Sequence, residues 1–299
     1  MSCISCVFVR IHLLTLLRSV EQYDVHVEPL VVTGFWRVQS SKHSFQDYAA
    51  WFTNFAQIPT KPLVFCALED REFLERTWVE VSGRAPRFEL WNFWQFHSHT
   101  LGVNWSLQEQ LDPEIQTHKG KDLYLIWNER PFLMLRATML FPNATHFLWL
   151  DIGIFRDWDT LYKFDLHYFA TCPQDKVMML NVNAFNEEDL QVFMGLPKKD
   201  FADRSSPEPD RIAGGEFWGC ASAIRRLAHA YFELLEKLAA DGRFVGKDQI
   251  VYNSLFVIQP ELLHLLPSDG RGDPWFTFAR LFFNRDKRAR YDGCNSNVE

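Results

Sequence analysis

An acidic side chain directly follows a run of apolar residues in the middle of the chain. Residues 147–150 are Phe-Leu-Trp-Leu, and Asp151 and Gly153 come next. A continuous apolar run of this length is typical of a buried strand, and open α/β sheets bind ligands where their strands end. There a carboxylate can hold a divalent cation or a ribose hydroxyl, and Gly153 would let a ligand approach the backbone. The alternative is that Asp151 only caps a turn.

A second candidate site is rich in glycine. Gly214, Gly215, Glu216 and Trp218 lie within five residues of one another. Glycine permits backbone conformations that other residues resist, so this segment predicts a loop fitted to a ligand. Trp218 could stack on a sugar face, and Glu216 could bind a sugar hydroxyl or accept a proton. A tight turn before a helix is the alternative.

Three further charged residues could take part in the same chemistry. Asp248 opens a predicted helix, where it could act as a base or only complement the helix dipole. Arg130 lies near the start of a predicted helix and Lys42 follows the first predicted strand, and we expect both to meet a diphosphate. Solvation at the surface is the alternative for both cations.

The elements that would position these residues alternate between strands and helices. We expect strands at 31–33, 63–67, 147–150, 177–180 and 276–283, and helices at 44–57, 122–141, 186–196, 224–238 and 246–258. Thr33 ends the first strand, just before Gly34 breaks it, so it is a candidate for ligand binding. Periodicity leaves 88–96 undecided between strand and helix.

This alternation predicts one α/β domain over residues 27–290, with a mostly parallel central sheet between two layers of helices. Residues 1–26 are expected to be a leader or the remnant of an anchor, through which membrane association stays open, and residues 291–299 a tail. The segment 198–211 is rich in Asp, Ser and Pro, and we expect it to be mobile and to close over a ligand.

Composition excludes some classes of function. The net charge of −7 argues against a nucleic-acid binder, whose affinity would depend on clustered Lys and Arg. The glycine loop that cradles phosphates in ATPases is absent from the sequence. Cys66 and Cys220 lie among apolar residues and are expected to be buried. The triplets at Asn104 and Asn143 fit a secretory lumen, but the cytoplasm stays open as well.

Four segments together resemble the HtrL/YibB family of glycosyltransferase-like proteins, some of which are tied to bacterial surface polysaccharide. They are VVTGFWRV with SKHSFQDYAAWFTNF, LYLIWNERPFLMLRATMLFPNATHFLWLDIG, GGEFWGC and GKDQIVYNSLF, within residues 30–267. The resemblance implies a GT-A-like fold and a nucleotide-sugar donor. Such enzymes usually carry an Asp-x-Asp that grips a metal, whereas the matching place here reads Asp151-Ile152-Gly153.

The reaction implied is transfer of a hexose from a nucleoside diphosphate sugar to a hydroxyl of a glycan or glycoconjugate. Asp151 would bind the donor ribose or Mn²⁺ or Mg²⁺, and Gly214 and Gly215 would line the donor sugar. Glu216 and Asp248 are the two acids from which an inverting enzyme would draw its base. A protein of the same fold that binds a carbohydrate or nucleotide sugar without transfer is the alternative, because the second Asp is missing.

Overall fold

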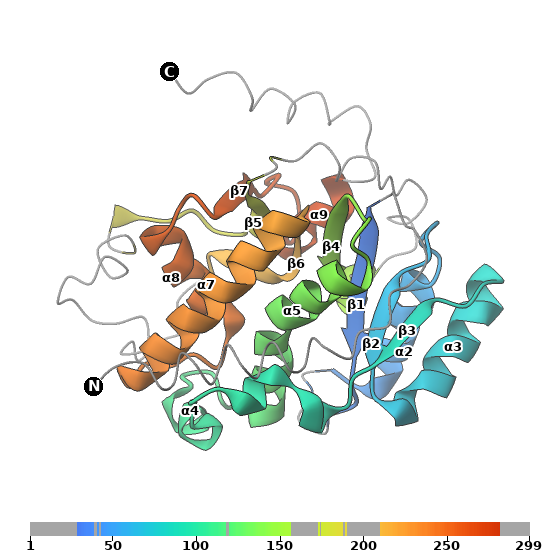
Figure 1. The fold of residues 1–299 in the computed structure, drawn as a ribbon, viewed down its shortest axis with the longest axis horizontal. Coiled ribbons are helices and arrows are strands. Elements are labelled where there is room, and N and C mark those ends of the chain that lie inside the picture. Colours follow the sequence, from blue (N-terminus) through green and yellow to red (C-terminus); the bar gives the residue numbers. More distant parts are fainter. Residues whose placement is uncertain are drawn as a thin grey trace.

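One sheet runs through the part of the chain that the computed structural model describes, which comprises residues 29–38, 41, 43–117, 120–156, 173, 175–187, 189 and 210–281. Within these residues seven strands lie in the order β3-β2-β1-β4-β6-β5-β7 (Figure 1). The strands are β1 (Leu30–Phe35), β2 (Leu63–Cys66), β3 (Arg87–Leu90), β4 (His146–Leu150), β5 (Val177–Asn181), β6 (Ile212–Cys220) and β7 (Leu263–Pro267).

Helices connect and cover these strands. The α-helices are α2 (Phe45–Phe55), α3 (Leu68–Ser82), α4 (Trp105–Leu111), α5 (Lys121–Leu140), α7 (Ala221–Ala240), α8 (Asp248–Ile258) and α9 (Thr277–Leu281). The short 3-10 helices are η1 (Phe93–Gln95), η2 (His97–Thr100), η3 (Ile152–Ile154) and η6 (Pro274–Phe276). Among the described residues, no helix combines the length and the apolar character that crossing a membrane requires.

The sheet is mostly parallel, as the alternation of elements predicted. β1 pairs in parallel with β2 and β4, β2 with β3, and β5 with β7. Only β6 runs antiparallel to its two neighbours, β4 and β5. The carboxyl ends of the parallel strands therefore meet at one edge of the sheet, the edge where open α/β sheets bind ligands.

Alternation along the strands builds a core on each face of the sheet. In β4, Phe147 and Trp149 join one buried cluster, whereas Leu148 and Leu150 join the other, because successive side chains of a strand point to opposite faces. The first cluster includes buried residues of α5, α7 and α8, and the second those of α2, α3 and α9. Two layers of helices thus enclose the sheet.

Several predicted elements are confirmed. Ser44 caps α2 with a complete capping box, in which its hydroxyl accepts a hydrogen bond from the Asp47 N–H and the Asp47 carboxylate accepts one from the Ser44 N–H. The unit of β1, α2 and β2 is the predicted βαβ opening. Both Cys66 and Cys220 are free and buried.

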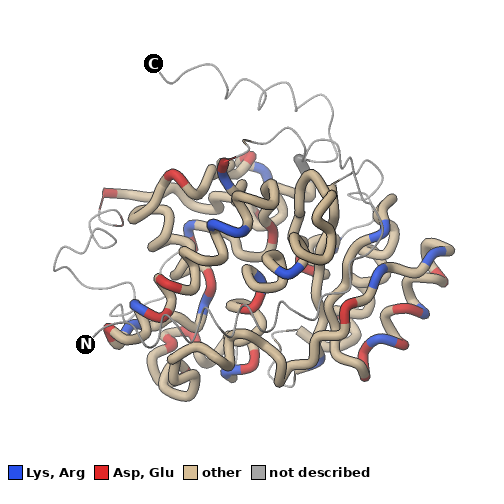
Figure 2. Tube along the Cα trace, viewed as in Figure 1, with Lys and Arg blue, Asp and Glu red and all other residues tan. Residues whose placement is uncertain are grey.

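Other predictions for single elements are wrong. Gly34 does not end the first strand but lies inside β1, where an added Cβ would lie 2.5 Å from the ring of Trp36. The strand expected at 276–283 is helical over Thr277–Leu281. Two elements, β7 and α3, were not predicted. Acidic and basic residues intermingle along α3, at the right of Figure 2. The leader, the tail and most of the segments 186–196 and 198–211 lie outside the described residues.

Candidate functional site

A pocket of about 630 Å³ opens at the carboxyl edge of the parallel strands. Its wall includes residues 34–38, which are the end of β1 and the segment that follows it, residues 151–154 after β4, and Gly215 and Glu216 of β6. Tyr48 and Trp51 of α2 add aromatic rings to the wall. This volume is in the usual range for sites that bind small organic molecules.

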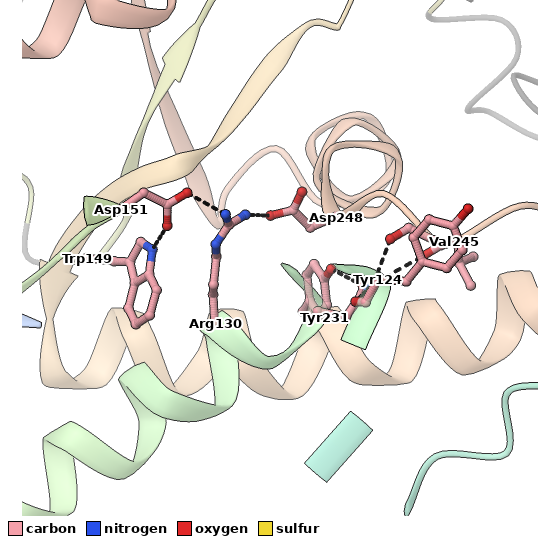
Figure 3. A network of polar contacts seen from close by, with 9 residues as sticks. Tyr124, Arg130, Trp149, Asp151, Tyr231, Val245 and Asp248 are labelled. Atoms are coloured by element: carbon pink, nitrogen blue, oxygen red, sulfur yellow. Dashed lines mark hydrogen bonds and ion pairs between the residues drawn. The ribbon is translucent and has the colours of Figure 1, made fainter. Parts of the chain in front are cut away.

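The guanidinium of Arg130 joins two of the predicted acids beside this pocket (Figure 3). Its Nη1 lies 2.6 Å from Asp248 Oδ2, and its Nη2 forms an ion pair with Asp151 Oδ2. Arg130 comes from α5, which is buried over most of its length, and the residue is only 7% exposed. Burial raises the pKa of both carboxyls, and the Arg130 charge opposes that shift.

Asp248 is positioned by a second network in the same view. Asn128, two residues before Arg130 on α5, donates hydrogen bonds to the carbonyl oxygens of Val245 and Gly246. Its own amide oxygen accepts a hydrogen bond of 2.5 Å from the Tyr231 hydroxyl. These contacts fix the segment that leads into α8, and with it Asp248 at the first residue of that helix.

Asp151 has a donor on each of its carboxylate oxygens. Trp149 Nε1 donates to Oδ1 at 2.8 Å, and Arg130 donates to Oδ2. A divalent cation at Asp151 would lie against the positive guanidinium of Arg130, which repels it. In the described part of the chain, no three His, Cys, Asp or Glu residues are grouped as metal ligands. The site therefore does not fit the Mn²⁺ or Mg²⁺ that Asp151 was predicted to hold.

Glu216 is a buried acid on the pocket wall. It pairs with Leu150 in the register of β6 and β4, and the residue is 3% exposed. Its Oε1 is buried and has no hydrogen-bond partner among the described residues. The pKa of Glu216 is raised well above its ordinary value, first because burial penalises the charged form and then because Asp151 lies near. A raised pKa makes a carboxylate a stronger base.

The three predicted acids thus lie together although they are far apart in sequence. The guanidinium of Arg130 bridges Asp151 and Asp248. The charge of Asp151 raises the pKa of Glu216, and the charge of Arg130 lowers it. If these acids met, they were expected to repel one another unless a cation lay between them, and at least one carboxyl was expected to have a perturbed pKa. Both expectations are met, because Arg130 lies between two of the acids and the pKa values of all three carboxyls are raised.

The glycine-rich segment is a strand rather than the predicted loop. Gly214 and Gly215 lie in β6, and their role is to make room for carboxylates. A Cβ on Gly214 would lie 2.1 Å from Asp248 Oδ2, and one on Gly215 would lie 3.1 Å from Asp151 Oδ2. Gly215 lines the pocket as predicted, whereas Gly214 is buried behind it.

Four other site predictions need correction or lie outside the described residues. Trp218 is 1% exposed and packs against Phe278 in the core, so its ring is not available to stack on a sugar. Thr33 is fully buried within β1 and is not part of the pocket wall. Asp248 is 1% exposed, is not part of the wall either, and is held by Arg130, which does not suit a base for an acceptor. Lys42 lies outside the described residues.

Two remaining predictions have mixed outcomes. Gly153 lines the pocket, and a Cβ there would lie 3.3 Å from the ring of Trp51. Arg130 also lines the pocket, but Asp151 and Asp248 already occupy its two terminal nitrogens, so it is poorly placed to be the principal partner of a diphosphate.

The sequence analysis missed Arg156. This exposed residue lies on the pocket wall, with its guanidinium carbon 4.5 Å from the ring centroid of Trp51 and 4.8 Å from that of Phe276. The two rings are 105 and 120 residues away in sequence, so no local pattern connects them with Arg156.

No protein-family model matches the sequence, and no curated protein matches it. The pocket has the position and the size that are usual for sites that bind small molecules, and a buried acid, Glu216, lies on its wall.

Proposed function

We propose that this protein is a GT-A-like glycosyltransferase, related to the HtrL/YibB family, that moves a hexose from a nucleoside diphosphate sugar to a hydroxyl of a glycan or glycoconjugate. The observation that carries the proposal is Glu216, a buried acid with an unpartnered oxygen on the wall of the 630 Å³ pocket. The α/β sheet, with its carboxyl edge at this pocket, and the sequence resemblance also support it.

Glu216 is the residue best placed to act on an acceptor. In an inverting reaction its carboxylate takes the proton of the acceptor hydroxyl while that oxygen bonds to the anomeric carbon of the hexose. The bond from that carbon to the diphosphate breaks, and its electron pair leaves with the diphosphate. The raised pKa of Glu216 suits the acceptance of this proton.

The other residues of the site bind and orient in this proposal. Asp151 is 35% exposed at its side chain, so it can still accept a hydrogen bond from a ribose hydroxyl while Arg130 holds it. Gly215 lines the pocket beside the Asp151 carboxylate and adds no side chain of its own, so the donor sugar meets its backbone and Asp151 there. The rings of Tyr48 and Trp51 offer flat surfaces for stacking a base or a sugar.

A protein that binds a nucleotide sugar without transfer is the second candidate. One observation favours it: the Arg130 and Trp149 donors already occupy Asp151, the residue that the resemblance assigns to the metal. Such a protein would keep the pocket and its ligand, but substitution of Glu216 would have no catalytic consequence.

Donor binding and donor turnover, measured separately, test the proposal. A panel of UDP- and GDP-sugars is first screened by thermal shift, since a ligand that binds the native state raises the melting temperature. Consumption of the binding donor is then followed with mixed glycan acceptors for the wild type, Glu216→Gln and Glu72→Gln. Glu72 is an exposed acid on α3, away from the pocket, and serves as the control.

If the protein is a transferase, we expect turnover in the wild type and in Glu72→Gln. The rate of turnover should fall about 100-fold or more in Glu216→Gln, which is the usual contribution of a general base. The binding protein predicts donor stabilisation without turnover in all three. If no nucleoside diphosphate or its sugar stabilises the wild type at millimolar concentration, both candidates are wrong.

A further inference from the structure

Four arginine and lysine side chains line the pocket in the described part of the chain, and three of them are neutralised by acids. The pairs are Arg37 with Asp70 at 2.6 Å, Arg130 with Asp151 and Asp248, and Lys247 with Glu114 and, at 3.7 Å, Asp210. A cation that is already paired with an acid binds an incoming anion weakly, because the existing ion pair must first be broken.

Arg156 is the fourth cation, and its side chain contacts no acid among the described residues. Trp51 and Phe276 hold the guanidinium by cation–π contacts. Trp51 is itself fixed by edge-to-face contacts with two other rings. Its ring centroid lies 4.8 Å from that of His43 and 5.3 Å from that of Tyr48. Contacts of this kind position the charge but use none of the five N–H donors of an arginine as hydrogen bonds.

The backbone at Arg156 is also anchored. The amide of Asn54 on α2 donates to the carbonyl oxygens of Phe155, at 3.0 Å, and Arg156, at 3.3 Å. An arginine fixed at both its backbone and its guanidinium loses less conformational entropy when it binds a ligand. Its planar fork of donors matches two oxygens of a phosphate.

We propose that Arg156, held between Trp51 and Phe276, is the binding residue for the diphosphate of the ligand, and that this binding needs no divalent cation. The proposal rests on the proposed function for the identity of the ligand as a nucleoside diphosphate. Two features of the site support it. Arg130 and Trp149 donate to Asp151, where a metal would be expected, and the Arg156 guanidinium lies on the pocket wall without an ion pair to any described acid.

The experiment measures binding of UDP, GDP and inorganic pyrophosphate by calorimetry, each in EDTA and in Mn²⁺. The proteins are the wild type, Arg156→Gln, Arg156→Lys and the control Arg84→Gln. Arg84 is exposed and is not part of the pocket wall. Far-UV circular dichroism and melting temperature establish that each variant is folded.

The wild type should bind at least one nucleotide and pyrophosphate with the same Kd in EDTA and in Mn²⁺. Loss of a charge-assisted contact should raise Kd about tenfold or more in Arg156→Gln. Arg156→Lys should recover part of this loss, because it keeps the charge without the planar fork, and Arg84→Gln should match the wild type.

Four results would contradict the proposal, or the function on which it rests, in different ways. Binding that appears only with Mn²⁺ refutes metal independence and leaves the proposed function intact. Binding in EDTA that Arg156→Gln does not weaken refutes the role of Arg156 alone. Arg156-dependent binding of pyrophosphate without any nucleotide binding refutes the proposed function but keeps the anion site, whereas no binding of any probe refutes both.

Discussion

Replacing Gly214 by alanine tests how closely β6 packs against Asp248. An added Cβ would lie 2.1 Å from Oδ2, 2.6 Å from Cγ and 2.9 Å from Oδ1 of that residue, and all three distances are too short for real contacts. The carboxylate has little room to retreat, because it is 1% exposed and its Oδ2 lies 2.6 Å from Arg130. Relief of the clash must therefore disturb the buried ion pair.

Two energies set the size of the effect. Overpacking a dense core costs about 1–3 kcal/mol, and disrupting a buried ion pair costs up to about 3–5 kcal/mol. The lower conformational entropy of unfolded alanine offsets up to roughly 1 kcal/mol of this. We therefore expect the free energy of unfolding to fall by about 2–4 kcal/mol, which corresponds to a decrease of roughly 5–10 °C in Tm.

Urea unfolding of Gly214→Ala is compared with that of Gly102→Ala. Gly102 is the matched control, because a Cβ there meets only Glu236 Oε1, at 3.9 Å. We expect Gly102→Ala to remain within about 0.5 kcal/mol of the wild type, as surface substitutions usually do. Equal stability of the two variants would refute the packing of β6 against Asp248, and with it our explanation of why this strand contains glycine.

Three further predictions concern buried charges. Arg130→Met should lower the free energy of unfolding by about 3–5 kcal/mol, and by more at pH 8 than at pH 5, because Asp151 and Asp248 become charged without a partner; urea titrations at both pH values measure this. Glu216→Gln should stabilise the protein at pH 8 relative to the wild type and have less effect at pH 5. The pKa of Glu216 is raised in the folded state, so the wild type loses stability as pH rises through that pKa, because the buried carboxyl becomes charged. A difference in unfolding free energy between the two proteins that did not change with pH in the same titrations would contradict this. Burial raises the pKa of Glu129 to about 7, so its contribution to stability should be lost as pH rises from about 4.5 through 7, by roughly 3 kcal/mol, and Glu129→Gln should remove that slope in denaturation curves between pH 4 and 8.

Local patterns in the sequence were sufficient where an element is stabilised by its own neighbours. The spacing of Phe45, Tyr48, Phe52 and Phe55 marks one face of a helix, and Ser44 supplies its cap, so α2 could be predicted to within two residues at each end. The apolar run before Asp151 identified β4 for the same reason. In both cases the residues that decide the structure lie within one turn or one strand.

Tertiary contacts decided the cases that failed. Two successive glycines lower the propensity of a segment for strand, so the sequence predicted a loop at Gly214 and Gly215. The strand forms because it pairs with β4 and β5, and glycine is needed in it because the side chains of Asp248 and Asp151 lie where its own side chains would be. Strand alternation then directs Trp218 into the core, where it packs against Phe278, a residue 60 positions away.

The acids of the site could be predicted from sequence. The sequence could not show which cation pairs with acids of the protein and which is exposed on the pocket wall. Arg130 and Arg156 both line the pocket, and the sequence favoured Arg130 because it lies near the start of a predicted helix. In the structure the buried Arg130 neutralises charge that the protein itself has placed beside β6, and Arg156 remains exposed, between two rings. A buried cation with two carboxylate partners cannot release them for a ligand without leaving charge uncompensated. Arg156 is exposed and forms no ion pair with an acid in the described part of the chain, so binding an anion there breaks no such pair. For this reason we propose the stabilising role for Arg130 and the ligand-binding role for Arg156.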